Sequence, residues 1–535
     1  MNYRTLPLLL LLTALPAWAG AIPERIETAI RDRIAAGGMK SVVVAMVDGD
    51  QTQIEGFGPG ADENTLFEIG SVTKTFTATL LAEQVVAGKL KLDQPVKSLL
   101  PGFTLPNFQG HEITLANIAE QDSGLPRMAA NFHPKDPGDP YADYDAGLMK
   151  AFLAGYKLPR APGASYEYSN LAVGLLGYGL ALKQHRSYGD LVAAHIFKPL
   201  GMTSSGVTQT LAPGFDGLGN PARSWHLDAL AGAGAIRSSG ADMQLYLKAY
   251  MGRMATPLRA AMDLAIAPRR DIAPGQRIGL IWMTAKDADQ TIIWHNGLTG
   301  GYASFIGFTA DRKRGVVILT NQAQPVDELG FAALSEAAPL APARKAVEMT
   351  AEQLDAYPAT YRLKDKFFIS VVKSKNQLFA RATGQMMFPL FASAPDQFFA
   401  KIDDITLHFQ RDGQGQVTSM LLHQGGRDFP CPKVSDHDAA AEFGAIDLDE
   451  KTLQPYIGQY RLQIGQPFEI AEADGQLRAR LGDQSAFAIF PKSRSSFFYL
   501  AVDAELDFQQ DPAGKVTGLI IHQNGHDLPA ARVEP

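Results

Sequence analysis

The stretch Phe67-Glu-Ile-Gly-Ser-Val-Thr-Lys-Thr-Phe-Thr-Ala-Thr-Leu-Leu81 joins a reactive pair of side chains to a helix. Ser71 and Lys74 form an S-x-x-K pair, and apolar residues recur behind it at roughly helical spacing as far as a candidate C-cap at Gly88. We therefore expect Ser71 at a helix start, with Lys74 one turn on along the same face. There a serine hydroxyl can attack a carbonyl while unpaired backbone N–H groups hold the oxyanion. A lysine that burial keeps partly neutral can accept the hydroxyl proton.

The S-x-x-K pattern is weak support when it stands alone. A second copy, Ser370-Val-Val-Lys373, falls in a stretch that reads as a strand with no helix behind it. The alternative for Ser71 is a helix N-cap followed by a surface lysine. The surrounding motifs have to decide between the two interpretations.

Composition narrows the class of protein. The 535 residues suggest roughly three domains, and 46% hydrophobic with 20% charged residues is typical of a globular chain. A net charge of −7 argues against a nucleic-acid partner or an anionic membrane surface. The single cysteine, Cys431, excludes an intrachain disulfide. No cysteine and histidine cluster at metal-ligand spacing and no Gly-rich phosphate loop is found, so we expect no metal and no cofactor.

The first 19 residues resemble a secretory signal. Arg4 precedes an apolar run over residues 8–15, and Ala17-Trp-Ala19 follows as an A-x-A site before Gly20. The run is short for a bilayer span, and no cysteine follows it to carry a lipid. We expect a mature protein that starts near Gly20 in the periplasm or outside the cell, without a stable membrane anchor. The alternative is an uncleaved anchor.

A second constellation is Tyr168-Ser-Asn170, which ends a polar loop and opens an apolar helix. A phenol close to a lysine ammonium is expected to have its pKa lowered, and a phenolate can act as a base. The carboxamide of Asn170 offers a donor and an acceptor, which could orient both Lys74 and a substrate amide. The alternative is a packed tyrosine with an asparagine N-cap.

A third constellation is His295-Asn-Gly297, at the end of a predicted strand before a glycine-rich turn. Gly297 would let a substrate backbone approach, and the N–H of Leu298 could complete an oxyanion hole. For His295 the alternative is a half-buried histidine bonded to a nearby carbonyl. Residues 291–308 and 316–320 are predicted to form the last three strands of this domain.

The three constellations together resemble the serine β-lactamase and penicillin-binding-protein superfamily, and within it the class C β-lactamase-like branch with its esterases and D-peptidases. The resemblance covers roughly residues 25 to 330 and includes the phrases Asp122-Ser-Gly-Leu-Pro126 and Gly232-Ala-Gly-Ala-Ile-Arg-Ser-Ser239. It implies an α/β (α+β) domain, an antiparallel sheet flanked by helices with a helical insertion.

The resemblance also implies roles for the residues of the three constellations. Ser71 would be the acylated nucleophile, Lys74 and Tyr168 would share the proton transfers, and Asn170 would position the substrate. The N–H groups of Ser71 and Leu298 would hold the oxyanion. How the proton transfers divide between Lys74 and Tyr168 stays open, as it does for S-x-x-K enzymes generally.

One departure from the family pattern bears on the substrate. Many members carry Lys-Thr-Gly where this chain has His295-Asn-Gly297, and a histidine is mostly neutral at neutral pH. We therefore expect weaker binding of free carboxylates than in those members. The expected function is an exported serine hydrolase acting on an ester or amide, with a small molecule or peptide, for example one from the cell wall, as substrate. The alternatives are a class C-type β-lactamase and a penicillin-recognising or peptidoglycan-binding protein without turnover.

The last third of the chain contains one small domain twice, at an offset of 99 residues. Tyr357 and Tyr361 correspond to Tyr456 and Tyr460, and many further identities keep the same offset. Short alternating strands between Gly, Asp and Asn turns predict an antiparallel barrel or sandwich in each copy. The pattern looks like the lipocalin-like barrel that follows some relatives' catalytic domains.

These patterns give an expected division of the chain. It comprises a signal peptide (1–19), a β-lactamase-like domain (20–335), a linker (336–350), a barrel-like repeat (351–434), a second linker (435–447) and a second barrel-like repeat (448–535). The repeated His423 and His522 are expected to be exposed polar positions on a strand. That the repeats gate the active site is a hypothesis; unchanged kinetics and specificity in a chain ending near Ser335 would refute it.

Overall fold

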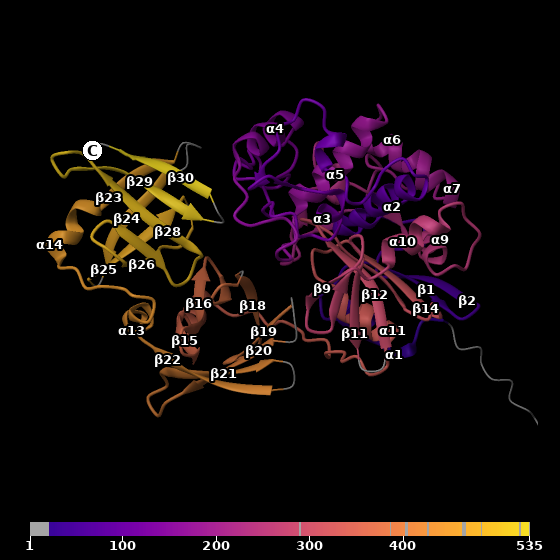
Figure 1. Ribbon diagram of the computed structural model, residues 1–535. Coiled ribbons are helices and arrows are strands. Elements are labelled where there is room, and N and C mark those ends of the chain that lie inside the picture. Colours follow the sequence, from indigo (N-terminus) through magenta and orange to yellow (C-terminus); the bar gives the residue numbers. More distant parts are fainter. Residues whose placement is uncertain are drawn as a thin grey trace, which may run out of the picture.

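The computed structural model describes residues 21–287, 290–385, 387–401, 405–424, 427–462, 467–473, 475–482, 484–523 and 526–533 (Figure 1). The predicted signal peptide of residues 1–19 lies outside them. Within the described residues, no helix is long and apolar enough to cross a membrane. An N-terminal domain of sheet and helices is followed by two closed antiparallel barrels of eight strands each, as the sequence predicted.

The N-terminal domain is built on one antiparallel sheet with the strand order β2-β1-β14-β13-β12-β11-β10-β9. Its strands are β1 (Val42–Asp48), β2 (Gln51–Phe57), β9 (Arg270–Ala273), β10 (Gln276–Ile278), β11 (Met283–Asp287), β12 (Gln290–Leu298), β13 (Ala303–Thr309) and β14 (Arg314–Thr320). The first hairpin of the chain therefore pairs directly with the last strand of the domain. This closure brings the start and the end of the domain into one sheet.

The central strands are apolar because both faces of the sheet are covered. Along β1, Val43 and Ala45 pack into the larger core, whereas Val44 and Met46 pack into a second core on the opposite face. Side chains alternate between the faces of a strand, so a strand buried on both faces is a continuous apolar run. Helices α1 (Glu24–Ala35) and α11 (Asp327–Leu334) cover the second face, and the other helices of this domain lie on the side of the first (Figure 1).

The larger core contains the helical insertion. Its helices are α2 (Thr73–Val86), α3 (Leu115–Ala119), α4 (Ala146–Gly155), α5 (Asn170–Lys183), α6 (Tyr188–Val192), α7 (Lys198–Leu200), α8 (Ala231–Gly234), α9 (Gly240–Tyr250) and α10 (Arg259–Ile266). A short strand pair, β3 (Leu66–Glu68) and β8 (Arg237–Ser239), and a 3-10 turn, η1 (Gly70–Val72), lead into α2. Residues 131–144 form neither helix nor strand, as predicted.

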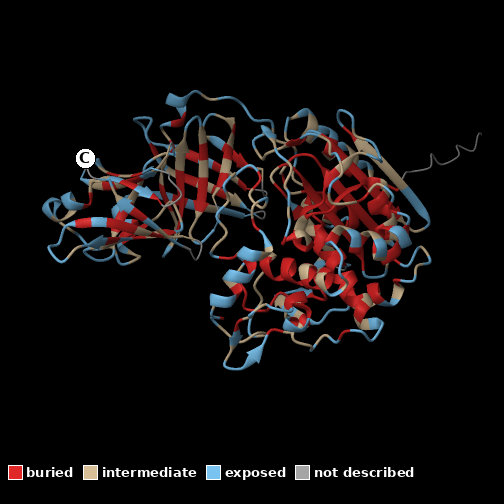
Figure 2. Ribbon diagram, turned by 90° about the horizontal axis from the view of Figure 1, so that it is seen from above, coloured by how far each residue is buried: buried red, intermediate tan, exposed pale blue. Residues whose placement is uncertain are grey.

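Helix α2 lies at the centre of this domain and is buried nearly all round. Its threonines remain compatible with burial because their hydroxyls are hydrogen-bonded. Thr75 donates to the carbonyl of Val72 over 2.8 Å, and Thr77 donates to the carbonyl of Gly232 over 2.7 Å. A buried hydroxyl without a partner would cost roughly 1–3 kcal/mol. These bonds satisfy the hydroxyls of α2 within an N-terminal domain whose interior is largely buried (Figure 2).

The two barrels have the same strand order, each strand pairing with the next and the last with the first. The first barrel comprises β15 (Ala359–Lys364), β16 (Phe367–Ser374), β17 (Gln377–Ala382), β18 (Phe388–Ala394), β19 (Gln397–Ala400), β20 (Ile405–Arg411), β21 (Val417–Gln424) and β22 (Arg427–Val434). The second comprises β23 (Gly458–Leu462), β24 (Pro467–Ala473), β25 (Gln476–Leu481), β26 (Phe487–Pro491), β27 (Ser496–Tyr499), β28 (Ala504–Gln510), β29 (Val516–Gln523) and β30 (His526–Arg532).

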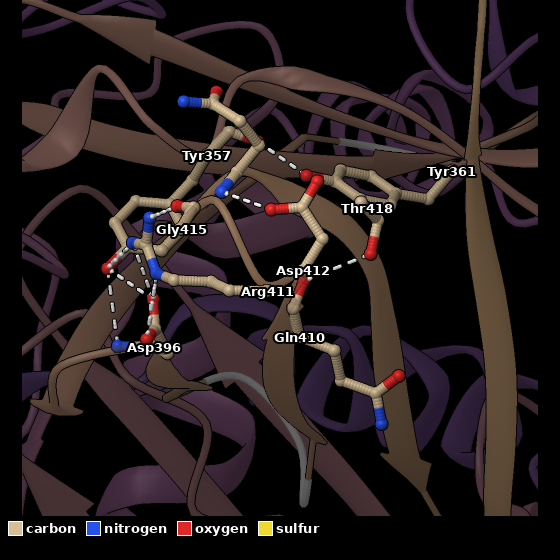
Figure 3. A network of polar contacts seen from close by, with 9 residues as sticks. Tyr357, Tyr361, Asp396, Gln410, Arg411, Asp412, Gly415 and Thr418 are labelled. Atoms are coloured by element: carbon tan, nitrogen blue, oxygen red, sulfur yellow. Dashed lines mark hydrogen bonds and ion pairs between the residues drawn. The ribbon is translucent and has the colours of Figure 1, made fainter.

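The offset of 99 residues reappears as an equivalent contact in each barrel. The hydroxyl of Tyr361 donates to the carbonyl of Tyr357 over 2.9 Å, and Tyr460 donates to Tyr456 over 2.7 Å. The first barrel adds an ion pair: Arg411 donates to Asp396 over 2.7 Å, and Tyr357 donates to the same carboxylate over 2.9 Å (Figure 3). The second barrel has serine and glutamine at the matching positions 495 and 510. The two copies therefore share a framework but not this charge.

The connections between the parts are short. Between α11 and α12 (Ala351–Leu354), residues 335–350 form neither helix nor strand. The segment 435–447, predicted as a plain linker, instead carries the helix α13 (Asp436–Ala441), which Ser435 caps by accepting the N–H of Asp438. We propose the division of the chain given above, with α13 as part of the second connection.

Candidate active site

Ser71 lies in the turn η1, and Lys74 lies in the first turn of α2. The Lys74 Nζ donates to Ser71 Oγ over 2.7 Å and to the carbonyl of Ala233 in α8 over 2.7 Å. The change from a 3-10 turn to an α-helix places the two side chains on one face, as their spacing predicted. The second S-x-x-K copy lies within strand β16, also as predicted.

Lys74 is fully buried, and its surroundings disfavour the charged form. Burial lowers the pKa of Lys74 well below its usual value, and the positive charge of Arg127 lowers this pKa further. Both of its hydrogen bonds can be made by a neutral amine as well as by an ammonium. Lys74 is therefore able to take up a proton from Ser71 at ordinary pH.

Tyr168 lies against the same pair. Its hydroxyl is hydrogen-bonded to Ser71, and the centroid of its ring is 5.0 Å from Lys74 Nζ. The expectation of a lowered pKa is wrong: burial raises the pKa of Tyr168, and this outweighs the hydrogen bond from Ser71 and the charge of Arg127. Burial thus disfavours the phenolate more than these neighbours favour it, and the tyrosine keeps its proton.

The C-terminal half of β12 borders the serine. Strand β11 pairs with β12 only as far as Trp294, so residues 295–298 have β13 on one side and η1 on the other. His295, Asn296 and Gly297 thus lie at the end of a strand, where the sequence pattern placed them. The site is thus built where the sheet loses one strand.

Gly297 is required by this close approach. A Cβ atom there would lie 2.1 Å from the carbonyl oxygen of Ile69 and 2.9 Å from the backbone nitrogen of Ser71. A Cβ on Gly70, whose φ is +49°, would lie 2.8 Å from the backbone nitrogen of Leu298. The backbone nitrogen of Ser71 therefore lies close to Gly297, and the backbone nitrogen of Leu298 lies close to Gly70. Both nitrogens belong to the two segments that meet at the serine. An oxyanion hole needs two backbone N–H groups close to the nucleophile in this way.

His295 is almost completely buried on the same face of β12 as Gly297. Burial lowers the pKa of His295 to about 3, with Lys74 contributing, and its Nδ1 lies 2.7 Å from the carbonyl oxygen of Asn296. The ring is therefore neutral across the physiological range. The hydrogen bond to a nearby carbonyl is the one that the alternative interpretation of His295 expected.

Asn170 is the predicted site residue whose contacts differ most from expectation. Its carboxamide is hydrogen-bonded to the hydroxyl of Tyr141, and its buried Oδ1 has no hydrogen-bond partner among the described residues. It therefore does not orient Lys74, whose bonds go to Ser71 and Ala233. The N-cap of α5 is Ser169, which leaves the Asn170 side chain free for other contacts.

Two contributors to the site were not among the predicted residues. The carbonyl of Ala233 holds Lys74, and Arg127 places its guanidinium carbon 5.1 Å from the centroid of the Tyr168 ring. Both belong to, or directly follow, phrases that resemble the family. The role of the Ala233 carbonyl cannot be read from the residue type, because every residue has a backbone carbonyl. Arg127 is different, because it directly follows the phrase Asp122-Ser-Gly-Leu-Pro126 and its charge is visible in the sequence. Across the described part of the chain, no cluster of metal-ligating side chains occurs.

The comparisons with known proteins agree with this geometry. Residues 26–338, more than half of the chain, match the β-lactamase family, and residues 343–442 and 444–532 each match a domain of unknown function, DUF3471. A β-lactamase of Pseudomonas fluorescens is 28% identical over 302 residues, which cover 49% of this chain and 81% of that protein. The D-alanyl-D-alanine-carboxypeptidase/endopeptidase AmpH of Escherichia coli K12 is 26% identical over 341 residues, covering 57% and 85%.

Solved structures show the same fold. The β-lactamase/D-alanine carboxypeptidase of Yersinia pestis has a TM-score of 0.51 at 24% identity, over 58% of this chain and 95% of that one. A class C β-lactamase has a TM-score of 0.52 at 23% identity, over 58% and 96%. The family match agrees with the sheet, the helical insertion and the serine–lysine pair described above. The chain belongs to the β-lactamase family, whose members are serine hydrolases.

Proposed function

We propose that this protein is an exported serine hydrolase that works through a covalent acyl-enzyme on an ester or amide. The observation that carries the proposal is the 2.7 Å contact between Lys74 Nζ and Ser71 Oγ, made by a fully buried lysine whose pKa is well below its usual value. A serine needs such a base to become a nucleophile. A surface lysine behind a helix cap would be charged and solvated.

In the acylation step, neutral Lys74 takes the proton of Ser71 Oγ while the oxygen attacks the substrate carbonyl carbon. The carbonyl oxygen becomes an oxyanion, which the N–H groups of Ser71 and Leu298 stabilise. Each such donor contributes roughly two to three orders of magnitude in rate. Gly297 keeps these amides close to the serine because no side chain separates the two backbones.

Collapse of this intermediate expels the leaving group, which needs a proton. Tyr168 is placed to donate it, since its hydroxyl is protonated and hydrogen-bonded to Ser71. The Lys74 ammonium then returns a proton to the phenol. Deacylation reverses these transfers, with water as the nucleophile. The raised pKa of Tyr168 and the lowered pKa of Lys74 together support a lysine base and a tyrosine acid.

The substrate is proposed to be an ester or an amide of the esterase or D-amino-acid peptidase type. Neutral, buried His295 supports this choice, because it offers no cation where many relatives have lysine. The second candidate is a class C-type β-lactamase activity, because relatives of this chain are named β-lactamases. Nitrocefin turnover well above that of a simple ester would favour that candidate.

The test is labelling of the purified protein with a fluorophosphonate, followed by mapping of the modified residue. We expect one label per chain on Ser71, none in Ser71→Ala, and full labelling in Ser370→Ala, which removes the serine of the second S-x-x-K copy. A burst followed by steady release from an ester substrate would support turnover. Labelling that survives in Ser71→Ala would refute the proposal.

A further inference from the structure

Arg127 lies on the segment between α3 and α4, which runs beside the start of α5. Its side chain is exposed, and its guanidinium carbon is 5.1 Å from the centroid of the Tyr168 ring. The same ring centroid is 5.0 Å from Lys74 Nζ. The positive charge of Arg127 also lowers the pKa values of both Lys74 and Tyr168. The guanidinium is therefore within electrostatic reach of the reacting groups.

The backbone of this loop is fixed to the start of α5. The carbonyl of Arg127 accepts the N–H groups of Asn170 over 3.0 Å and of Leu171 over 3.2 Å. One residue earlier, the carbonyl of Pro126 accepts the hydroxyl of Ser169 over 2.6 Å. Arg127 is thus anchored next to the segment that supplies Tyr168 and Asn170, and only its side chain is free to move.

The charge of Arg127 is not neutralised within the described residues, where its guanidinium makes no ion pair with an acid. Neighbouring arginines differ: Arg160 pairs with Glu167, and Arg270 pairs with Asp122. An unpaired guanidinium over an aromatic ring can still bind a carboxylate through two parallel hydrogen bonds.

The other cations of the site cannot do this. Lys74 is fully buried with a lowered pKa, and His295 is neutral. The Oδ1 of Asn170, on the residue whose N–H bonds to the carbonyl of Arg127, is buried and has no donor among the described residues. Beside Tyr168, the exposed guanidinium of Arg127 is therefore the permanent positive charge that an anionic group can reach.

We propose that Arg127 determines specificity by binding an anionic group of the substrate, so that the preferred substrates are negatively charged esters or amides such as peptides with a free carboxylate. This inference rests on the proposed acyl-enzyme function. It changes the expectation drawn from His295 alone: the cation that many relatives carry on the strand is absent, but a different element supplies one.

The test compares three esters that share one core. Phenyl hexanoate is neutral, monophenyl adipate carries a carboxylate on the acyl part, and 3-carboxyphenyl hexanoate carries it on the leaving group. The readout is the ratio of kcat/KM for each anionic ester to that for the neutral ester. Any change in Lys74 basicity caused by the loss of Arg127 affects all three esters alike and cancels in these ratios.

We expect the wild type to prefer at least one anionic ester, and Arg127→Gln to reduce that ratio about tenfold or more, because hydrogen bonds to charged groups are the strong ones. Arg127→Lys should retain part of the preference, and added salt should weaken it in the wild type. Arg223→Gln is the matched control: it removes the same charge from an exposed arginine that pairs with Asp136, and it should leave the ratios unchanged.

The outcomes separate the two proposals. Hydrolysis that continues in Ser71→Ala contradicts the proposed function itself. Ser71-dependent hydrolysis with ratios that are equal in the wild type, Arg127→Gln and Arg127→Lys leaves that function intact and overturns the role of Arg127. Thermal unfolding of each variant shows that it is folded, and Arg127→Lys carries the test if Arg127→Gln is not.

Discussion

Gly297→Ala tests the proposed oxyanion hole with a single methyl group. The new Cβ would lie 2.1 Å from the carbonyl oxygen of Ile69 and 2.9 Å from the nitrogen of Ser71, whereas ordinary contacts begin at 3.4 Å. The Cβ would also lie 2.5 Å from Ser304 Oγ, but the other two obstacles are backbone atoms, so moving that side chain aside does not relieve the clash. The strand and the turn η1 have to separate by about 1 Å, and a shift of that size in an active site costs roughly 100-fold in rate.

The expected result is a fall in kcat of about 100- to 1000-fold, since one oxyanion donor is effectively lost. The free energy of unfolding should fall by about 1–3 kcal/mol, as for other overpacked sites. Steady-state ester hydrolysis gives the first quantity, and thermal or urea unfolding gives the second. Because the lost interaction belongs to the transition state, KM should change little.

Gly155→Ala is the control for this experiment. Gly155 ends helix α4, and a Cβ there meets no atom within 4 Å. Rate and stability should both stay close to wild type. The reasoning is refuted if Gly297→Ala is folded and retains kcat within about threefold of wild type, a change far below the loss of one donor.

Three further predictions concern charge. Lys74→Arg should lower acylation of Ser71 about 1000-fold at every pH between 6 and 9, because a guanidinium cannot give up its proton; recovery at high pH would contradict a lysine base. When the pH falls from 7 to 5, the free energy of unfolding should fall by about 2 kcal/mol more in the wild type than in His295→Asn, because the unfolded histidine binds a proton and the buried one does not. Urea unfolding at each pH measures this, and an equal dependence on pH in both proteins would contradict it. Asp396→Ala should weaken hydrogen-exchange protection in the first barrel by about 1 kcal/mol, and Ser495→Ala should have less effect on the second; equal effects would show that the ion pair is unimportant.

The fold and the centre of the site follow from local sequence patterns. A serine and lysine one helical turn apart must share a face, and glycines at a strand end predict a close backbone approach. The identity of Tyr357 with Tyr456 at a fixed offset was enough to predict two copies of one domain. In each of these cases the local pattern decides the geometry.

What could not be predicted depends on burial from distant parts of the chain. The pKa of Tyr168 was expected to fall beside a lysine, but both side chains are enclosed by the same core and burial dominates. Lys74 also donates a hydrogen bond to the backbone carbonyl of Ala233. The residue type at position 233 gives no indication of this contact, because any residue has such a carbonyl. Likewise, α13 was missed because its six residues carry little helical periodicity.

The most direct measurement is rapid-quench mass spectrometry of the intact protein mixed with an ester substrate. The account predicts a transient increase of one acyl group per chain, located on the peptide that contains Ser71, and its absence in Ser71→Ala. Turnover without any acylated protein, or an acyl group on another residue, would contradict it.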